Sequence, residues 1–525
     1  MEQYLVKLIC NNKFFNMKYL IKKYSKLIIA LIVISISENS CEKKLDPVVY
    51  SQFSTSTFFK TASDANAAVT AMYAGMLGGW NISEGGWSGS NFGWKTQSSM
   101  QTDELICSWG WPGWKRMNQL QLSTDDDVIT GVYTGLMPVI TEITIYIDKI
   151  SGIDMDANLK KQYLAELHGL RGCYSQVLYN LYGPVPIRLD PTTAEDPNTK
   201  PIPRPSHDSM VAYIESDYKQ AASVLPATFS GNDYGRFSSG ACLTGLMKLY
   251  MKERRWNDAV TIGEQIKGMG YSLTTNYVDN FTIKNKGGNS EIILSIPCNS
   301  SASLSYNNWL SDVLPGVPEY VDPSGLPLQK WSGYKMPWST QGKFDPNDKR
   351  TTRLFRKYPV DLNGTLFDAK TGGTINGVYY PPLIGAIPMK YGPDPGATGG
   401  GSGVDIIVWR YADVELLLAE AINNLNGPTA EAYALINDVR NRAGVAAFPD
   451  GSLSKIQFLS KIMDERLFEF WCEGQRREDM IRWGTFYQYS ASQGSAFANA
   501  NDTLYPLPVK VISETNGIVK QNPGY

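Results

Sequence analysis

The sequence predicts a mainly α-helical protein, a scaffold of paired helices that carries one long loop-rich insert. Apolar residues recur at spacings of three and four over much of the chain, as they do on one face of an amphipathic helix. This periodicity disappears between about residues 275 and 405, where Pro, Gly, Asn and Tyr dominate. Because each apolar stripe must be buried against another, we expect the helices to stack as hairpins.

Composition agrees with a large globular chain that has many structured loops. The 525 residues are 43% hydrophobic, which is enough to bury a sizeable core. The 49 Lys and Arg residues and 51 Asp and Glu residues leave a formal charge of -2, so there is no basic surplus for a phosphate backbone and nucleic acid is not an expected partner. The 13 Trp, 30 Tyr, 47 Gly and 29 Pro residues indicate loops that carry flat side chains.

Residues 1–40 have the features of a secretory signal. A lysine-containing segment at 22–26 precedes an apolar run at 27–36, and this run is shorter than the roughly 20 residues that span a bilayer. Cys41 follows a small residue, as in bacterial lipoprotein signals, although Glu38 stands where such signals usually have an apolar residue. We expect a lipid on Cys41 to anchor the mature chain. Ordinary secretion with cleavage nearby is the alternative.

Apolar periodicity also marks the expected helices. The first begins at the N-cap candidates Ser63 and Asp64 and runs to Tyr73, and a Gly- and Trp-rich loop at 78–114 follows it. Further helices are expected at 124–147, 164–181, 211–225, 241–251, 256–266, 411–423, 429–443 and 462–471. In pairs they resemble four degenerate tetratricopeptide (TPR-like) hairpins, although no strict 34-residue repeat is visible.

We expect a single domain after the signal, with Met17 as an alternative start of the chain. Binding residues concentrate on loops that a rigid scaffold positions, so the insert is the expected place for a binding site. The expected parts are TPR-like helices at 45–275, the insert at 276–405, and C-terminal hairpins and a tail at 406–525.

Most catalytic and metal-binding patterns are missing from the sequence. His168 and His207 are the two histidines, and the seven cysteines include no CxxC pair, so neither a zinc site nor a cofactor is expected. His168 is expected to pack inside its helix, and His207 to cap a helix or face solvent. The glycine run at 399–403 lacks a phosphate-binding motif and predicts a flexible connection, and the acidic run at 125–127 predicts a helix N-terminus rather than a calcium loop.

Tryptophans gather in two separate stretches. The first stretch contains Trp80, Trp87, Trp94, Trp109, Trp111 and Trp114, and the insert contains Trp309, Trp331 and Trp338. Loop tryptophans between glycines have less helical core to enter than helical ones, so some of these rings are expected to face a ligand. For any single ring the alternative is that it locks its own loop together.

Several sequence blocks, in order, resemble one known family. They are Leu45-Asp46 with Phe58-Phe59-Lys60-Thr61 and Asp64 to Tyr73; Tyr163 to Arg171 with Leu181-Tyr182-Gly183-Pro184-Val185-Pro186; Trp409 to Val414 with Leu418 to Ala421 and Asn437 to Gly444; Glu465-Arg466 with Glu473 to Gly484; and Gln521 to Tyr525. From residue 45 to the C-terminus they resemble the SusD/RagB family of nutrient-uptake lipoproteins. Gly169 and Gly172 depart from its usual helix formers.

The resemblance implies a SusD-like fold and a non-enzymatic function. It implies capture of a glycan or similar nutrient at the cell surface and delivery to a SusC-like TonB-dependent transporter of the outer membrane. A surface polysaccharide-acting glycoside hydrolase and a structural TPR-like adaptor are the alternatives. The charged residues of the last blocks are expected to pair between helices rather than to catalyse. They are Glu465, Arg466, Glu473, Arg476 and Asp479.

For a glycan ligand, both tryptophan stretches are expected to meet on one face. A pyranose presents C–H groups on a ring face and hydroxyls at its edge, so an aromatic platform with polar neighbours binds it. Asp103, beside Glu104, could orient hydroxyls, and the alternatives for this pair are loop structure and hydrolysis. The expected ligand contacts are Trp109, Trp111 and Trp331 above all, then Trp87, Trp94, Trp309, Trp338 and Asp103.

Overall fold

A computed structural model describes most of the mature chain. The described residues are 58–76, 94–300, 306–397, 399–492, 494–496, 499 and 503–525. The expected signal, Cys41 and Trp87 lie outside these ranges. All elements below belong to the compact unit Phe59–Tyr525. Within the described ranges, no helix combines the length and the apolar character that crossing a membrane requires.

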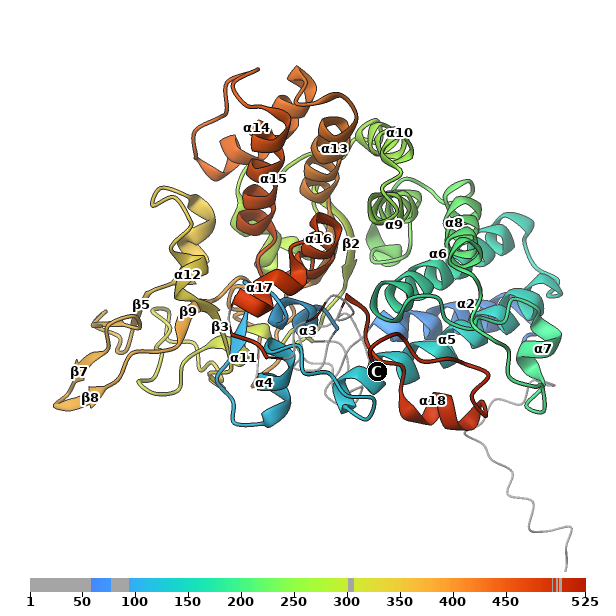
Figure 1. Ribbon diagram of the computed structural model, residues 1–525, viewed down its shortest axis with the longest axis horizontal. Coiled ribbons are helices and arrows are strands. Elements are labelled where there is room, and N and C mark those ends of the chain that lie inside the picture. Colours follow the sequence, from blue (N-terminus) through green and yellow to red (C-terminus); the bar gives the residue numbers. More distant parts are fainter. Residues whose placement is uncertain are drawn as a thin grey trace, which may run out of the picture. The chain divides into compact units, whose positions relative to one another are not determined.

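Helices dominate the regular structure, which confirms the mainly α-helical fold (Figure 1). The α-helices are α2 Ala62–Met72, α3 Trp94–Met100, α4 Pro112–Asn118, α5 Asp127–Ser151, α6 Ala157–Tyr182, α7 Pro191–Glu195, α8 His207–Ala222, α9 Ser239–Lys252, α10 Trp256–Lys267, α11 Trp309–Val313, α12 Trp338–Gln341, α13 Tyr411–Asn426, α14 Ala430–Ala443, α15 Lys455–Phe470, α16 Arg476–Trp483, α17 Phe486–Ser492 and α18 Val509–Glu514. The long helices pack in sequence-adjacent pairs, among them α5 with α6, α9 with α10 and α13 with α14.

Helix α6 is the centre of the N-terminal helices, because it packs against α2, α5 and α8. This packing explains the two glycines of the helix, Gly169 and Gly172. A Cβ atom on Gly169 would lie 2.8 Å from the ring of Phe237 and 3.2 Å from Sγ of Cys242. The helix accepts the lower propensity of glycine, about 1 kcal/mol relative to alanine, because a side chain there would force the neighbouring elements apart.

Two expectations about the N-terminal region are wrong in detail. Helix α2 begins before Ser63: its N-cap is Thr61, and Asp64 completes a capping box in which the Thr61 N–H donates to Asp64 Oδ2 at 2.8 Å. The segment expected as loop up to residue 114 contains α3 and the start of α4. Helix α3 has seven residues, five of them polar although all are buried, so it has no apolar stripe for a sequence pattern to reveal.

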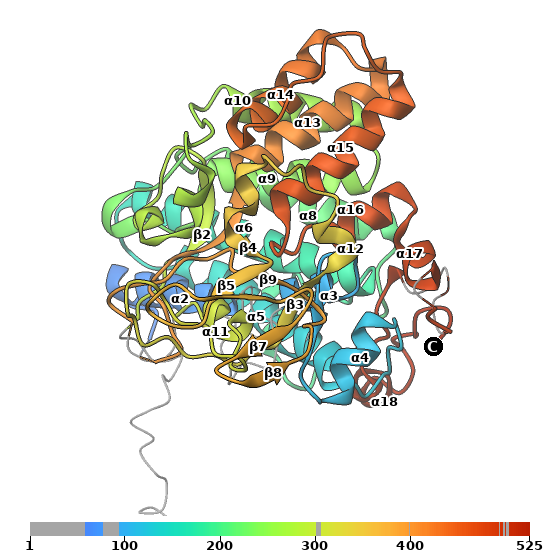
Figure 2. The ribbon, with the colours of Figure 1, turned by 90° about the vertical axis from the view of Figure 1, so that its left-hand side faces the viewer.

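Most of the short strands lie in the insert, and β1 and β10, which lie outside residues 276–405, pair with insert strands. The strands are β1 Ile106–Cys107, β2 Ile292–Ile296, β3 Tyr334–Pro337, β4 Leu354–Phe355, β5 Lys357–Pro359, β6 Leu366–Asp368, β7 Gly373–Ile375, β8 Val378–Tyr380, β9 Gly385–Pro388 and β10 Ile406–Arg410. Four of them form an antiparallel sheet in the order β1-β3-β9-β4, while β10 pairs with β2. Figure 2 faces the side on which the insert strands lie, with α13, α14 and α15 at the top.

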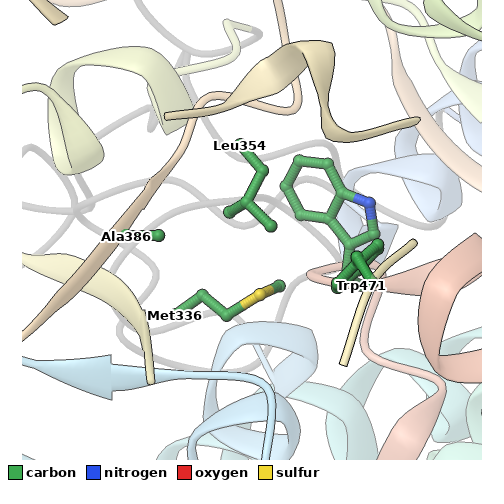
Figure 3. Close-up of a cluster of buried hydrophobic side chains, with 5 residues drawn as sticks. Met336, Leu354, Ala386 and Trp471 are labelled. Atoms are coloured by element: carbon green, nitrogen blue, oxygen red, sulfur yellow. The ribbon is translucent and has the colours of Figure 1, made fainter. Parts of the chain in front are cut away.

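A hydrophobic cluster joins this sheet to the C-terminal helices. Met336 of β3, Leu354 of β4 and Ala386 of β9 pack with Trp471, which follows α15 (Figure 3). All four side chains are buried. Burial of a large aromatic ring at this junction stabilises both partners, so the insert is fixed to the helical scaffold by its core and not only by its chain ends.

Buried charges connect the same regions. Arg410, at the end of β10, forms ion pairs with Glu291 at 2.8 Å and with Glu469 and Glu473. Glu469, in the last turn of α15, also pairs with Arg442 of α14 and, at 3.0 Å, with Arg350 of the insert. Each of these side chains is less than a tenth exposed. We refer to the set formed by Glu291, Arg350, Arg410, Arg442, Glu469 and Glu473 as the charged core.

The other expected charge pairs are also present. Arg466 binds Asp479 at 2.7 Å, and Arg476 binds Asp103 at 2.8 Å. Glu465 binds Arg350 at 2.6 Å. The prediction of pairs between helices is confirmed for Arg466 with Asp479 and for Glu465, which also pairs with Arg440 of α14 at 2.6 Å. Glu473 and Arg476 pair instead with Arg410 and Asp103, which lie outside the α-helices.

Replacing Glu469 by Gln should destabilise the fold strongly. Burial raises the pKa of Glu469, but the charges of Arg442, Arg410 and Arg350 outweigh it and hold the pKa well below its usual range. Glutamine removes one of the three carboxylates of the charged core and leaves its three guanidinium groups with one uncompensated positive charge, so we expect a loss of about 3–5 kcal/mol in the free energy of unfolding. Urea unfolding followed by circular dichroism at pH 7 measures this loss.

The matched control is Glu514→Gln, an exposed carboxylate of α18, which should change stability by less than about 0.5 kcal/mol. Because the pKa of Glu469 is depressed in the fold, its contribution is present above the unfolded pKa of about 4 and is lost as the pH falls below that value. A Glu469→Gln protein as stable as wild type at pH 7 would refute the role of the charged core.

Candidate functional site

The first tryptophan stretch and the insert meet, as the sequence predicted. Strand β1 pairs antiparallel with β3, so Ile106 lies opposite Lys335 and Cys107 opposite Tyr334. The ladder continues beyond the strands, since the Ser108 N–H donates to the Gly333 carbonyl at 2.9 Å. This pairing places the loop at 108–114 beside the loop that leads into β3.

Trp109 ties the two loops together. Its indole N–H donates to the carbonyl of Trp331 at 2.7 Å. The ring lies over Gly333, where a Cβ atom would come within 2.4 Å of it, so only glycine allows this contact. The ring also packs against Trp114 and Tyr334, with centroid distances of 5.8 and 5.1 Å. Trp109 is therefore half-buried and rigidly held by both loops.

Trp111 and Trp331 are the two exposed tryptophans of this region. Trp111 is 36% exposed and Trp331 is 39% exposed. Trp111 stands edge-on to buried Trp114, with ring centroids 5.1 Å apart. The Trp331 ring lies against Gly400 and near the side chain of Gln329, because a Cβ atom on Gly400 would lie 3.0 Å from both. We call the surface formed by Trp109, Trp111, Gln329, Trp331 and Gly400 the aromatic platform.

Tyr334 supports the platform from below. It is fully buried, and Trp309 stacks on it with ring centroids 5.7 Å apart and an interplanar angle of 11°. The Trp309 N–H donates to the Pro388 carbonyl at 2.8 Å. Trp309 is therefore a packing residue beneath the platform, and the structure does not support the prediction that it contacts ligand.

Two other predicted tryptophans also point away from the platform. Trp94 is buried in α3. Trp338 begins α12, donates its N–H to the Leu383 carbonyl at 3.0 Å, and packs on the hydrophobic cluster around Trp471. Trp94 is enclosed by protein, and the partly buried Trp338 belongs to a different cluster, so we leave both out of the candidate site.

Asp103 does not reach the platform either. It is buried, and its carboxylate accepts hydrogen bonds from Arg476 at 2.8 and 3.1 Å and from Lys343 at 3.0 Å. Burial raises its pKa, but the charges of Arg476 and Lys343 outweigh burial and lower it. A carboxylate held by two cations has little capacity left for sugar hydroxyls, so its role is structural.

Glu104, its neighbour, is also enclosed. It is fully buried and accepts a hydrogen bond from the Ser99 hydroxyl at 2.8 Å. Burial raises its pKa to about 8, so it is mainly protonated at neutral pH. The acidic pair therefore does not provide two opposed carboxylates at a surface, which is what glycoside hydrolysis requires.

The groups beneath the platform carry little charge. Lys335, which is almost fully buried, has its pKa lowered to about 7 by burial, and its ammonium donates only to two backbone carbonyls. Burial likewise raises the pKa of Asp312 well above its usual range, and that of the Cys107 thiol to about 12. These three groups are therefore partly or wholly neutral near pH 7. The Arg116 guanidinium, in contrast, lies over the Trp111 ring, 5.9 Å from its centroid.

Sequence reasoning missed the contributions of Gln329 and Gly400. Gln329 is an exposed amide beside the Trp331 ring, and amide groups both donate and accept hydrogen bonds. Gly400 belongs to the run expected as a flexible connection, yet its carbonyl accepts a hydrogen bond from Ser311 at 2.8 Å, and nearby Ser402 forms a bridge with Asn307. The only sequence signal for Gln329 was its position inside the insert. The only signal for Gly400 was its position near the end of the insert.

The fold and the sequence both match a known class of proteins. A solved structure titled laminarin binding SusD-like protein matches with a TM-score of 0.75 and 21% identity, over 89% of this chain and 100% of that chain. The model of the SusD family matches residues 339–525, and the model described as starch-binding associating with outer membrane matches residues 51–251. The class is that of SusD-like proteins.

Curated relatives agree over nearly the whole length. The SusD-like protein P25 of Formosa agariphila is 25% identical, over 92% of this chain and 94% of its own length. The starch-binding protein SusD of Bacteroides thetaiotaomicron is 23% identical, over 82% of this chain and 84% of its own length. The chain belongs to the SusD/RagB family, as its sequence blocks predicted.

Replacing Glu104 by Gln should stabilise the protein at neutral pH. The folded pKa of about 8 lies above the unfolded value, so folding takes up a proton, and stability falls as the pH rises between about 4.5 and 8. Glutamine keeps the shape without titrating. We expect Glu104→Gln to gain about 1–3 kcal/mol over wild type at pH 7.5.

Urea unfolding at pH 7.5 and pH 4.5 separates this effect from packing, because the gain should shrink at the lower pH. Glu514→Gln again serves as the control for loss of one carboxylate. A stability difference that is the same at both pH values would contradict a protonated Glu104.

Proposed function

We propose that the chain is a non-enzymatic carbohydrate-binding protein that captures an uncharged oligosaccharide on the aromatic platform. The observation that carries this proposal is the pair of exposed rings, Trp111 and Trp331, which Trp109 and Trp114 hold on one support. Sugar ring faces stack on such indoles, and the Gln329 amide can bond hydroxyls at the ring edge.

The proposed ligand class is a neutral glucan or similar oligosaccharide. Relatives are named for binding laminarin and starch, and both of these ligands are neutral polysaccharides. Laminarin and starch oligosaccharides are therefore the first ligands to test.

We further propose that the protein acts at the outer membrane. One matching family model is described as associating with outer membrane. Export by the signal at residues 1–40 and a lipid on Cys41 would place the mature chain on the outer surface. Delivery of the bound oligosaccharide to a SusC-like TonB-dependent transporter completes the proposal, and it rests on the family resemblance. A hydrolase is not proposed, because Asp103 and Glu104 are both enclosed in the protein.

Alanine at Trp111 or Trp331 should weaken oligosaccharide binding more than tenfold. A stacking indole that is lost from a binding surface costs roughly 2 kcal/mol or more. Because both rings are already partly exposed, their removal should leave the melting temperature nearly unchanged. Isothermal titration calorimetry with laminarin and starch oligosaccharides measures the affinity.

Tyr487→Ala is the matched control, since Tyr487 on α17 is 36% exposed and lies outside the platform. It should bind like wild type. Chromatography of the sugars after prolonged incubation should find them uncleaved. Unchanged affinity in the Trp111→Ala, Trp331→Ala double variant would place the site elsewhere, and released sugar would overturn the non-enzymatic proposal.

Cys41→Ala should release the protein from the membrane. With the lipid absent, the chain loses its anchor, so most of it should move from the membrane pellet to the soluble fraction. Mass spectrometry of the wild-type N-terminus should find an acylated Cys41, and Cys107→Ala should remain in the pellet. A mature N-terminus at another residue without lipid would reject this anchor.

A further inference from the structure

A second concave site lies between helices α6, α9 and α16. It has a volume of about 310 Å³, which is at the lower end of the sizes of small-molecule sites, about 300–1,000 Å³. None of its lining residues belongs to the aromatic platform. They are Tyr179, Asn180, His207, Lys248, Met251, Lys252, Glu253, Arg254, Leu417, Glu478, Ile481 and Arg482. We call this site the helical groove.

The lining of the helical groove mixes basic and acidic groups, and several of them are already paired. Lys248 pairs with Asp413 at 3.2 Å, and Arg482 pairs with Glu420 at 2.7 Å and with Asp479 at 2.9 Å. Glu253 accepts a hydrogen bond from the Tyr179 hydroxyl at 2.7 Å and lies 2.9 Å from His207. Glu478 accepts a hydrogen bond from Asn180 at 2.8 Å. Lys252 and Arg254 are therefore the two lining cations that form no ion pair with a carboxylate in the described part of the chain.

Lys252 is the clearest unsatisfied group of the groove. Its ammonium lies over the ring of Tyr179, 4.9 Å from the centroid, and no hydrogen-bond acceptor contacts it among the residues that the structure describes. Burial lowers its pKa, although Glu478 and Glu253 act in the opposite direction. An ammonium group with reduced solvation gains most from an anionic acceptor.

Arg254 occupies an unusual backbone position at the edge of the groove. It follows the C-cap of α9 with a φ of +56°, a left-handed conformation at which glycine is the usual residue. One of its guanidinium nitrogens donates to the Arg482 carbonyl at 3.0 Å, and the rest of the fork remains available. The backbone does not require arginine here, so the side chain itself needs an explanation.

We propose that the helical groove binds a small molecule that carries an oxyanion, a carboxylate, sulfate ester or phosphate, with Lys252 and Arg254 as the anion-binding residues. The planar fork of Arg254 fits such an anion through paired hydrogen bonds, and Lys252 adds a second charge. The apolar side chains of Met251, Leu417 and Ile481 line the same groove and pack on the body of the ligand. This site is independent of the platform and of its proposed function.

The Arg254→Gly variant separates the backbone conformation of this residue from the proposed role of its side chain in binding the anion. Glycine favours the left-handed backbone, so this variant should be at least as stable as wild type. If Arg254 binds the anion, the same variant should lose affinity at least about tenfold, and Lys252→Met should behave alike. Lys510→Ala, an exposed lysine of α18, is the matched control and should bind like wild type.

The probes are glucuronate, galactose 6-sulfate and glucose 6-phosphate, with glucose as the neutral control, titrated into the full mature chain by calorimetry or ligand-observed NMR. At least one charged sugar should bind, with an affinity that falls as NaCl is raised, and glucose should not bind at this site. The Trp331→Ala variant should keep this binding, which distinguishes the groove from the platform. Absence of binding by all three charged sugars, or binding that is unchanged in Arg254→Gly and Lys252→Met, would overturn the proposal.

Discussion

The charged core around Arg410 and Glu469 is the interaction on which the rest of the structure depends. Arg410 pairs with three carboxylates, and Glu469 pairs with three guanidinium groups. Buried charges are tolerated only as a complete set, because removing one partner leaves another uncompensated in a low-dielectric interior. The set draws Arg410 from β10, Arg442 from α14, Glu469 from α15, Glu473 from the segment after α15, and Glu291 and Arg350 from the insert, so these elements depend on one another for stability.

This constraint reaches the aromatic platform through the four-stranded sheet. Arg350 lies just before β4, which pairs with β9, and β9 pairs with β3. Strand β3 begins at Tyr334, on which Trp109, Trp114 and Trp309 pack. Lys390, just after β9, donates to Glu473 at 2.5 Å and to the Trp471 carbonyl at 2.7 Å. The helical scaffold thus holds a surface made of loops in a fixed position, and this is how irregular segments can carry binding sites.

The sequence predicted what depends on local pattern and missed what depends on remote partners. The periodicity of apolar residues predicted helices such as α6 and α13, and glycine-rich surroundings indicated that Trp111 and Trp331 are exposed. The structural role of Asp103 could not be predicted, because its partner Arg476 lies 373 residues away in the sequence. Helix α3 was not predicted because it is short and five of its seven residues are polar, so it has no apolar stripe although all of them are buried.

The arrangement of the platform also bears on affinity. Trp109 is fixed by a hydrogen bond to Trp331 and by contact with Gly333, so its ring is positioned before any ligand arrives. Ordering a flexible side chain costs about 0.5–1.5 kcal/mol on binding, and rings that are already held by their neighbours avoid most of this cost. The two exposed rings can then use their contact area for the ligand. For the proposed ligand site, the glycine at position 333 and the burial of Tyr334 therefore matter as much as the exposed indoles, because a side chain at Gly333 would displace Trp109 and with it the support of Trp331.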